Sequence, residues 1–204
     1  MYTLYSYPVS QHSRRVAALL AEAGIDYEAR IVDMEKGEYL SPEYLAVNPN
    51  HQVPTLIDGD LKIHESNAIL RYICNVHGLV SWYPTDARAR ALVDQWLDWN
   101  QCQLGPAVVN IVLNKVFMPE LGNTKAIELG EEQIKELFPI LAARLSQSDY
   151  LAGDQVTIAD LSVAANVTHL WFADVMSEDQ AIGDWIERMM AVSGFRKTLP
   201  APLR

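Results

Sequence analysis

Two kinds of hydrophobic spacing divide the chain into a first part that mixes strands with helices and a second part that is helical. Polar and apolar residues alternate over residues 2–7, which predicts a strand that Pro8 ends. Apolar residues then recur at helical spacing until Gly24, a typical helix stop. A second strand-like run follows over residues 27–32, so residues 2–32 predict a βαβ unit.

Residues 41–75 continue the mixed pattern. Ser41-Pro42 predicts the start of a short capped helix, and Asp58-Gly59 is a typical hairpin turn between two short apolar runs. Glu65-Ser66 then begins an apolar-periodic segment that predicts a helix through about Asn75. The resulting order, βαβαββα, predicts an α/β fold in which helices pack on a small mixed sheet.

After residue 77 the pattern becomes purely helical. Glycine and proline punctuate residues 77–85, which indicates a domain boundary. We therefore predict an α/β domain over residues 1–78, a linker over 79–86 and an all-α helical bundle over 87–204. The bundle should begin with a long helix kinked at Gly105-Pro106. Three more helices are expected, near residues 129–145, where Pro139 should loosen one turn, and at 157–172 and 178–192.

The segment around Val53-Pro54 does not fit an ordinary strand, because proline cannot donate a hydrogen bond to a neighbouring strand. A cis peptide bond before proline costs only about 0.5 to 1 kcal/mol, and it can turn the backbone of Val53 outward to pair with an extended peptide ligand. The helix that begins at Glu65-Ser66 has free N–H groups that attract a carboxylate. These features together predict a cradle for a peptide that carries a carboxylate.

Composition and charge limit the classes of protein to consider. The 204 residues are half hydrophobic, which is enough for real hydrophobic cores. The net charge of −10 argues against nucleic acid or an anionic membrane as a partner. There is no signal-peptide pattern and no apolar run of the roughly 18 residues that a membrane span needs, so we expect a cytoplasmic protein. Cys74 and Cys102 lack metal-ligand spacing, so we expect buried reduced thiols and no metal.

Ser10 lies where the first predicted strand meets the first predicted helix. A hydroxyl at a helix N-terminus can donate to an anion, and a bound thiol there could have its pKa lowered from about 8.5 to roughly 6 or 7. Taken alone, Ser10 or Ser13 is more often an ordinary helix N-cap, and the signal becomes specific only beside the Val-Pro and Glu-Ser elements. The chain has no GxSxG motif, and neither His12 nor His51 has an acidic partner nearby in sequence, so a serine hydrolase triad is not expected.

Five motifs, in this order, resemble the glutathione S-transferase superfamily, in its theta and delta-like branch. They cover nearly the whole chain and comprise Ser10-Gln11-His12-Ser13-Arg14-Arg15-Val16, Asn48-Pro49-Asn50-His51-Gln52-Val53-Pro54-Thr55-Leu56, Glu65-Ser66-Asn67-Ala68-Ile69, Val93-Asp94-Gln95-Trp96-Leu97-Asp98-Trp99, and Tyr150-Leu151-Ala152-Gly153-Asp154 with Thr157-Ile158-Ala159-Asp160. The resemblance implies a thioredoxin-like domain that binds glutathione as co-substrate and a helical domain that supplies the electrophile pocket.

The resemblance also implies a role for individual residues. Ser10 would stabilise the glutathione thiolate as the catalytic residue. His51 and Gln52 would hold the glycyl carboxylate, while Val53 would pair with the cysteinyl backbone if Pro54 is cis. Glu65, Ser66 and Asn67 would form the γ-glutamyl site.

Two positions depart from the pattern of theta-like members. Asn67 stands where many members have arginine, so the γ-glutamyl carboxylate would rely on Ser66 and the helix N-terminus. Binding would then be weaker, or a partner subunit would compensate. His12 stands where proline is common, and it would either line the electrophile pocket or be exposed. Other residues expected in that pocket are Asn110, Leu113, Phe117 and Trp171.

The leading hypothesis is a cytosolic, homodimeric glutathione transferase that conjugates glutathione to small hydrophobic electrophiles, as in detoxification. One alternative is a glutathione-transferase-like module that binds a protein partner and has little catalysis. Another is a dehalogenase, isomerase or peroxidase that uses the same thiolate. Thr157 and Asp160 form a Thr-x-x-Asp capping box, and their role should be structural.

Overall fold

The computed structural model describes residues 1–203 and begins with a four-stranded mixed sheet. Its strands are β1 (Tyr2–Ser6), β2 (Tyr27–Ile31), β3 (Thr55–Asp58) and β4 (Leu61–His64), in the order β2-β1-β3-β4. β1 is parallel to β2 and antiparallel to β3, and the β3–β4 hairpin turns at Gly59, whose φ of 61° suits glycine. The helices among them are α1 (Gln11–Glu22), α2 (Pro42–Leu45) and α3 (Ser66–Val76). The predicted βαβαββα order is confirmed.

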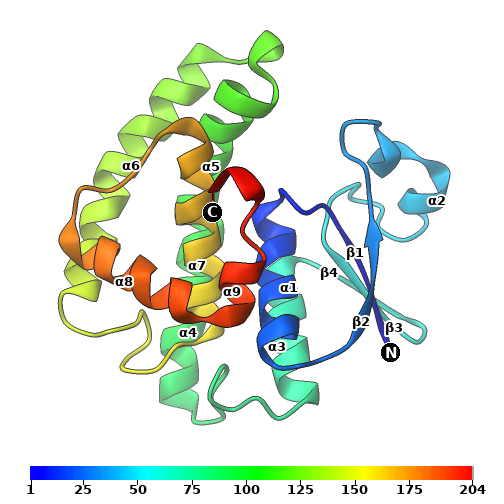
Figure 1. Cartoon of the computed structure of the whole chain (residues 1–204), viewed down its shortest axis with the longest axis horizontal. Coiled ribbons are helices and arrows are strands. Elements are labelled where there is room, and N and C mark those ends of the chain that lie inside the picture. The colour runs from blue at the N-terminus through cyan, green and yellow to red at the C-terminus, as the bar shows by residue number, and fades with distance from the viewer. Residues whose placement is uncertain (204) are drawn as a thin grey trace.

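Alternation along β1 builds the core of this domain. Tyr2, Leu4 and Ser6 are buried, whereas the residues between them are partly exposed. Leu4 meets the apolar face of α1, where Val16 and Leu19 are fully buried. Figure 1 shows α1 and α3 between the sheet and the remaining helices.

The rest of the chain is helical, as predicted. Its α-helices are α4 (Ala87–Trp99), α5 (Gly105–Val112), α6 (Thr124–Leu145), α7 (Ile158–His169), α8 (Gln180–Ala191) and α9 (Ser193–Lys197). Short elements comprise the 3₁₀ turns η1 (Glu38–Leu40), η4 (Pro119–Leu121), η5 (Leu170–Ala173) and η6 (Ala201–Leu203), and the π-helical turns η2 (Asn100–Leu104) and η3 (Leu113–Phe117). None of the helices in residues 1–203 is long and apolar enough to cross a membrane.

The predicted interruption of the long helix takes the form of a π-helical turn. η2 ends at Leu104, directly before Gly105 and Pro106, and α5 continues from there. Proline has no N–H for the helical ladder, so a wider turn before it accommodates the missing bond. Pro139 lies inside α6, which stays helical through it. The second π-helical turn, η3, carries no glycine or proline and was not predicted.

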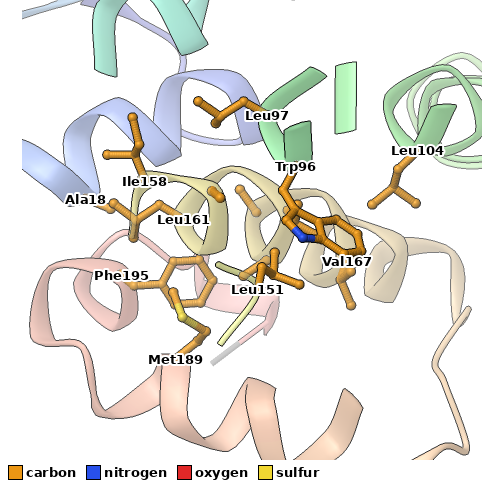
Figure 2. Close-up of a cluster of buried hydrophobic side chains, with 14 of the residues drawn as sticks. Ala18, Trp96, Leu97, Leu104, Leu151, Ile158, Leu161, Val167, Met189 and Phe195 are labelled. Atoms are coloured by element: carbon orange, nitrogen blue, oxygen red, sulfur yellow. The ribbon is translucent and has the colours of Figure 1, made fainter. Parts of the chain in front are cut away.

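Helix α7 lies at the centre of the helical part, and all of its residues are buried. Figure 2 shows Leu161 and Val167 of α7 among side chains from α1, α4, α8 and α9. The predicted capping box begins this helix. The Thr157 side chain accepts a hydrogen bond from a backbone N–H of the first turn, and the Asp160 side chain accepts one from the Thr157 N–H. A helix buried on every side must also find partners for its polar residues.

The two parts of the chain meet along α1. This helix packs against α3, α7 and α9. Gly194 lets α9 approach closely, since a Cβ there would clash with the backbone of α1. Its N–H also donates to Glu22 at 2.7 Å. The helix that begins at Ser10 is therefore shared by the sheet and the helical bundle.

Candidate active site

A polar cleft opens at the junction of the sheet with the helical part. The space between its walls is about 360 Å³, a volume that includes open solvent at the mouth of the cleft. The lining residues are His12, Asn48, Asn50, Gln52, Val53, Pro54, His64, Glu65, Ser66 and Gln101. Six of the residues predicted for the site therefore meet in one place, although they come from three separate segments.

The Val53-Pro54 segment forms one wall of this cleft. The peptide bond between the two residues is cis, as the family resemblance required. The carbonyl of the preceding Gln52 accepts hydrogen bonds from the Tyr44 hydroxyl at 2.6 Å and from the Asn48 amide at 2.8 Å. Within residues 1–203, the backbone of Val53 forms no hydrogen bond with other backbone groups. Its N–H and C=O are therefore available to pair with an extended peptide.

The N-terminus of α3 forms another part of the cleft lining. Glu65 precedes the helix with a φ of 66°, a left-handed conformation that is rare outside glycine and is typical of functional sites. Its side chain does not cap the helix, and Ser66 follows it into the cleft. The first N–H groups of α3 and the Ser66 hydroxyl can therefore bind a carboxylate, and the Glu65 carboxylate can bind an amine.

Ser10 is the N-cap of α1, as either interpretation of the sequence required. Its Oγ accepts a hydrogen bond from the Ser13 N–H at 3.3 Å. A hydroxyl that accepts in this way keeps its own proton for a second partner. Ser10 is half-buried two residues before His12, but it is not among the residues that line the cleft. Ser13 is buried, and its Oγ accepts from the Tyr7 N–H instead.

Besides Ser10, two residues predicted to bind glutathione, His51 and Asn67, are not among those that line the cleft. His51 has a left-handed backbone, with a φ of 47°, and its exposed ring lies 6.5 Å from that of Tyr39. Asn67 is buried, donates to the Leu97 carbonyl at 3.1 Å and accepts from Ser162 at 2.7 Å. Its amide therefore joins α3 to the helical part.

Four lining residues were not predicted. Asn48 and Asn50 lie within the motif that contains the Val-Pro pair, and His64 directly precedes Glu65, so nearness in sequence was a usable signal. Gln101 comes from η2 in the helical part, and no local pattern marks it.

His12 connects the cleft with an aromatic cluster. Burial, the Arg15 charge and nearby His169 lower the pKa of His12 to about 3, so its imidazole is neutral. The ring of His169 stacks on Phe117 at 5.7 Å and meets the edge of Phe172 at 5.3 Å. The predicted role of His12 and Phe117 in an electrophile pocket fits this apolar surface, whereas His169 and Phe172 had not been predicted.

None of the other three residues expected in that pocket is among those that line the cleft. Asn110 faces α6, because a Cβ added to Gly130 of α6 would lie 3.1 Å from the Cβ of Asn110. Leu113 begins η3 and is partly exposed. Trp171 is half-buried in η5 and takes no part in the ring contacts of the described residues.

The two cysteines are free thiols with different surroundings. Cys74 is buried, and burial raises its pKa to about 12. Cys102 is exposed on η2, so the expectation that both thiols are buried was wrong for this residue. Helical spacing placed it on an apolar stretch, but the π-helical turn changes which side chains face inward. Residues 1–203 contain no group of three or more His, Cys, Asp or Glu side chains that could hold a metal ion.

Acid should destabilise the protein through His169. Burial, followed by the Arg14 and Arg15 charges, lowers the pKa of His169 to about 3. Below the usual histidine pKa of about 6.5, His169 of the unfolded chain binds a proton, whereas His169 of the folded chain does not. The free energy of unfolding therefore decreases as the pH is lowered. We expect a loss of about 2 kcal/mol between pH 7 and 5, from His169 alone.

Urea denaturation at the two pH values measures this loss. In a His169→Gln variant, whose side chain does not titrate, the difference in unfolding free energy between pH 7 and 5 should shrink by the same amount. An unchanged difference would show that His169 is not held neutral.

Comparisons with known proteins agree with this geometry. Residues 1–75 match the glutathione S-transferase N-terminal domain, and residues 124–194 match the glutathione S-transferase C-terminal domain. Glutathione S-transferase F10 of Arabidopsis thaliana is 40% identical over 167 residues, which cover 78% of this chain and 76% of that protein. The probable glutathione S-transferase GSTF2 of Oryza sativa subsp. japonica is 35% identical over 92% of this chain and 91% of its own length. The chain belongs to the glutathione S-transferase family.

Solved structures extend the comparison to the whole fold. The theta class glutathione S-transferase of Xanthomonas axonopodis pv. citri, solved with glutathione bound, has a TM-score of 0.91 at 27% identity and covers 100% of this chain and 99% of its own. Poplar glutathione transferase F1 has a TM-score of 0.89 at 28% identity, covering 97% and 95%. The superfamily prediction is confirmed. Within it, the two plant relatives are more similar in sequence than the D7 protein of Drosophila melanogaster, at 28% identity, so the predicted theta and delta-like branch is not favoured.

Proposed function

We propose that the protein conjugates glutathione to small hydrophobic electrophiles and that Ser10 stabilises the glutathione thiolate. The observation that carries this proposal is the cleft lined both by Val53, whose backbone is unpaired, and by the N-terminus of α3. A tripeptide with a carboxylate at each end can pair with Val53 at its centre, place one end at Ser66 and the other near Gln52.

The chemistry follows from the start of α1. The glutathione thiol loses its proton, the sulfur attacks an electrophilic carbon, and the leaving group departs with the bonding electrons. The Ser10 hydroxyl donates to the anionic sulfur, and the positive end of α1 favours the same charge. His12 is a poor acceptor for the thiol proton, because its pKa of about 3 lies far below that of a thiol. The proton therefore leaves to water or buffer.

The surroundings of His12 indicate the kind of second substrate. Phe117 and Phe172 contact each other at 5.6 Å between ring centroids, and both contact His169. Such a surface binds flat apolar groups through burial and edge-to-face contacts. Aryl halides and activated alkyl halides fit this description, so they are suitable first probes.

Affinity chromatography and turnover together test the proposed function. The protein should be retained on immobilised glutathione, should elute with free glutathione, and should conjugate a nitroaryl halide. Retention without turnover of any electrophile would favour the alternative of a binding module, and failure to bind glutathione would overturn the proposal.

We also propose that the protein is a homodimer. Large apolar side chains are exposed on three neighbouring elements of the chain, with Leu61 on β4, Val76 on α3 and Leu92 on α4. Exposed apolar side chains that gather in one patch are typical of a surface that another subunit covers, whereas isolated ones are ordinary. Sedimentation velocity should show a species of twice the monomer mass, and a monomer at micromolar concentration would contradict the proposal.

A further inference from the structure

Arg15 is a fully buried cation without an anionic partner. Its exposed fraction is 0%, and the neighbouring Arg14 is 2% exposed. Neither arginine forms an ion pair with a carboxylate in residues 1–203. Burial of a charge without a counterion costs several kcal/mol, and both guanidinium groups stay charged because their pKa values remain at about 9 and 10. A charge kept at such a cost points to a function.

All the partners of Arg15 are neutral. Its Nη1 donates to Ser162 Oγ at 2.9 Å, and its Nη2 donates to Asn166 Oδ1 at 3.2 Å. Both of these partners lie on the buried helix α7, and Asn100 closes the network by donating to Ser162 Oγ. Arg15 Nε has no hydrogen-bond partner within residues 1–203. The network holds the guanidinium in place but leaves its charge uncompensated.

The same guanidinium lies behind Ser66, one of the residues that line the cleft. Arg15 Nη1 lies 3.5 Å from Ser66 Oγ and 3.4 Å from Asn67 Oδ1. Ser66 lines the cleft at the N-terminus of α3, whereas Arg15 does not touch the cleft. The Ser66 hydroxyl therefore lies between the buried positive charge of Arg15 and the proposed position of the γ-glutamyl carboxylate.

We propose that Arg15 is a positioning residue that supplies, through Ser66, the positive charge that binds the γ-glutamyl carboxylate of glutathione. This inference rests on the proposed function. Ser66 Oγ accepts from Arg15, so its O–H is free to donate into the cleft, and such a chain of donors strengthens each bond in it. The bound carboxylate would in turn provide the anion that Arg15 lacks.

This arrangement explains how the site can work with asparagine at position 67. An arginine there would bring a positive charge from α3, but Asn67 is neutral and holds Arg15 by its Oδ1. The charge comes instead from α1, five residues after Ser10. Compensation therefore arises within the chain and does not need a residue from another subunit.

Calorimetric titration with two peptides tests the inference. The ligands are glutathione and γ-aminobutyryl-cysteinylglycine, which keeps the amine but lacks the γ-glutamyl carboxylate. Arg15→Gln should weaken glutathione binding by at least roughly tenfold, which corresponds to about 1.4 kcal/mol, and should weaken analogue binding by less than about threefold. Arg14→Gln is the matched control, since Arg14 has the same charge and similar burial but binds Thr168, and it should leave the ratio of the two affinities unchanged.

Equal losses for the two peptides in Arg15→Gln, or the same change of ratio in Arg14→Gln, would overturn the inference. If far-ultraviolet circular dichroism shows that Arg15→Gln does not fold, Arg15→Lys replaces it. Lysine keeps the charge but cannot span Ser66 and Asn166, so it should still weaken glutathione more than the analogue, and an unchanged ratio would again contradict the proposal. A wild-type protein that binds neither peptide would overturn the proposed function itself.

Discussion

Replacement of Ser10 by alanine should lower kcat/KM for conjugation of a nitroaryl halide by at least roughly tenfold, because one donor to a developing anion commonly contributes that much or more. The variant keeps the positive end of α1 but loses the hydroxyl that donates to the thiolate. Less of the bound glutathione is then ionised at neutral pH. The loss should shrink at higher pH, where the thiol ionises without help.

Ser13→Ala is the matched control for this experiment. Ser13 lies three residues further along α1, and its Oγ accepts from the Tyr7 N–H and not from a ligand. Its replacement should leave kcat/KM within about threefold. Both variants lose a hydrogen bond near the start of α1, so their stability should fall by about 1 kcal/mol each. Turnover that is unchanged in Ser10→Ala, or equally reduced in both variants, would contradict the role of Ser10.

Replacement of Asp160 by alanine should lower the free energy of unfolding by about 3 to 5 kcal/mol, because it removes the acceptor of four buried hydrogen bonds. The fully buried carboxylate accepts from the Leu151 N–H at 2.9 Å, the Thr157 N–H at 2.9 Å, the Thr157 hydroxyl at 3.0 Å and the Trp185 indole at 3.0 Å. Alanine leaves these donors buried and unpaired, and each unpaired group costs about 1 to 3 kcal/mol.

Asp179→Ala provides the comparison for Asp160. Asp179 also caps a helix, accepting from the Ala181 N–H, but it is exposed at the start of α8. Its loss should cost about 1 kcal/mol, because water can replace the cap. Urea denaturation of the two variants measures both values. A loss below about 1 kcal/mol in Asp160→Ala would mean that the network around α7 does not hold the fold together.

Local patterns predicted the parts of the fold that depend on local chemistry. Asp58-Gly59 turned out to be the hairpin turn, and Glu65-Ser66 begins α3, because turn and cap residues act over a few positions. The cis bond before Pro54 was expected from the family resemblance, because the local sequence only makes this isomer inexpensive. The Thr157 capping box was predictable, although the further bond of Asp160 to Trp185 was not.

Features that depend on tertiary assembly were missed. Arg14 and Arg15 carry charges that usually face solvent, and nothing near them in the sequence shows that they are buried. The Ser162 partner of Arg15 lies 147 residues later, on a helix whose polar residues need buried donors. Gln101 and His169 reach the site only after the helical part folds against α1. The direction of the Asn67 amide likewise follows from its contact with the Leu97 carbonyl.

Ionisation of enzyme-bound glutathione tests the central claim most directly. Thiolate absorbance in the ultraviolet, recorded against pH for the wild-type complex and for Ser10→Ala, gives the pKa of the bound thiol in each. We predict a pKa of roughly 6 to 7 in the wild-type complex and a clearly higher value in the variant. A bound thiol that titrates at its ordinary pKa in the wild type, or at the same pKa in both proteins, would contradict the account.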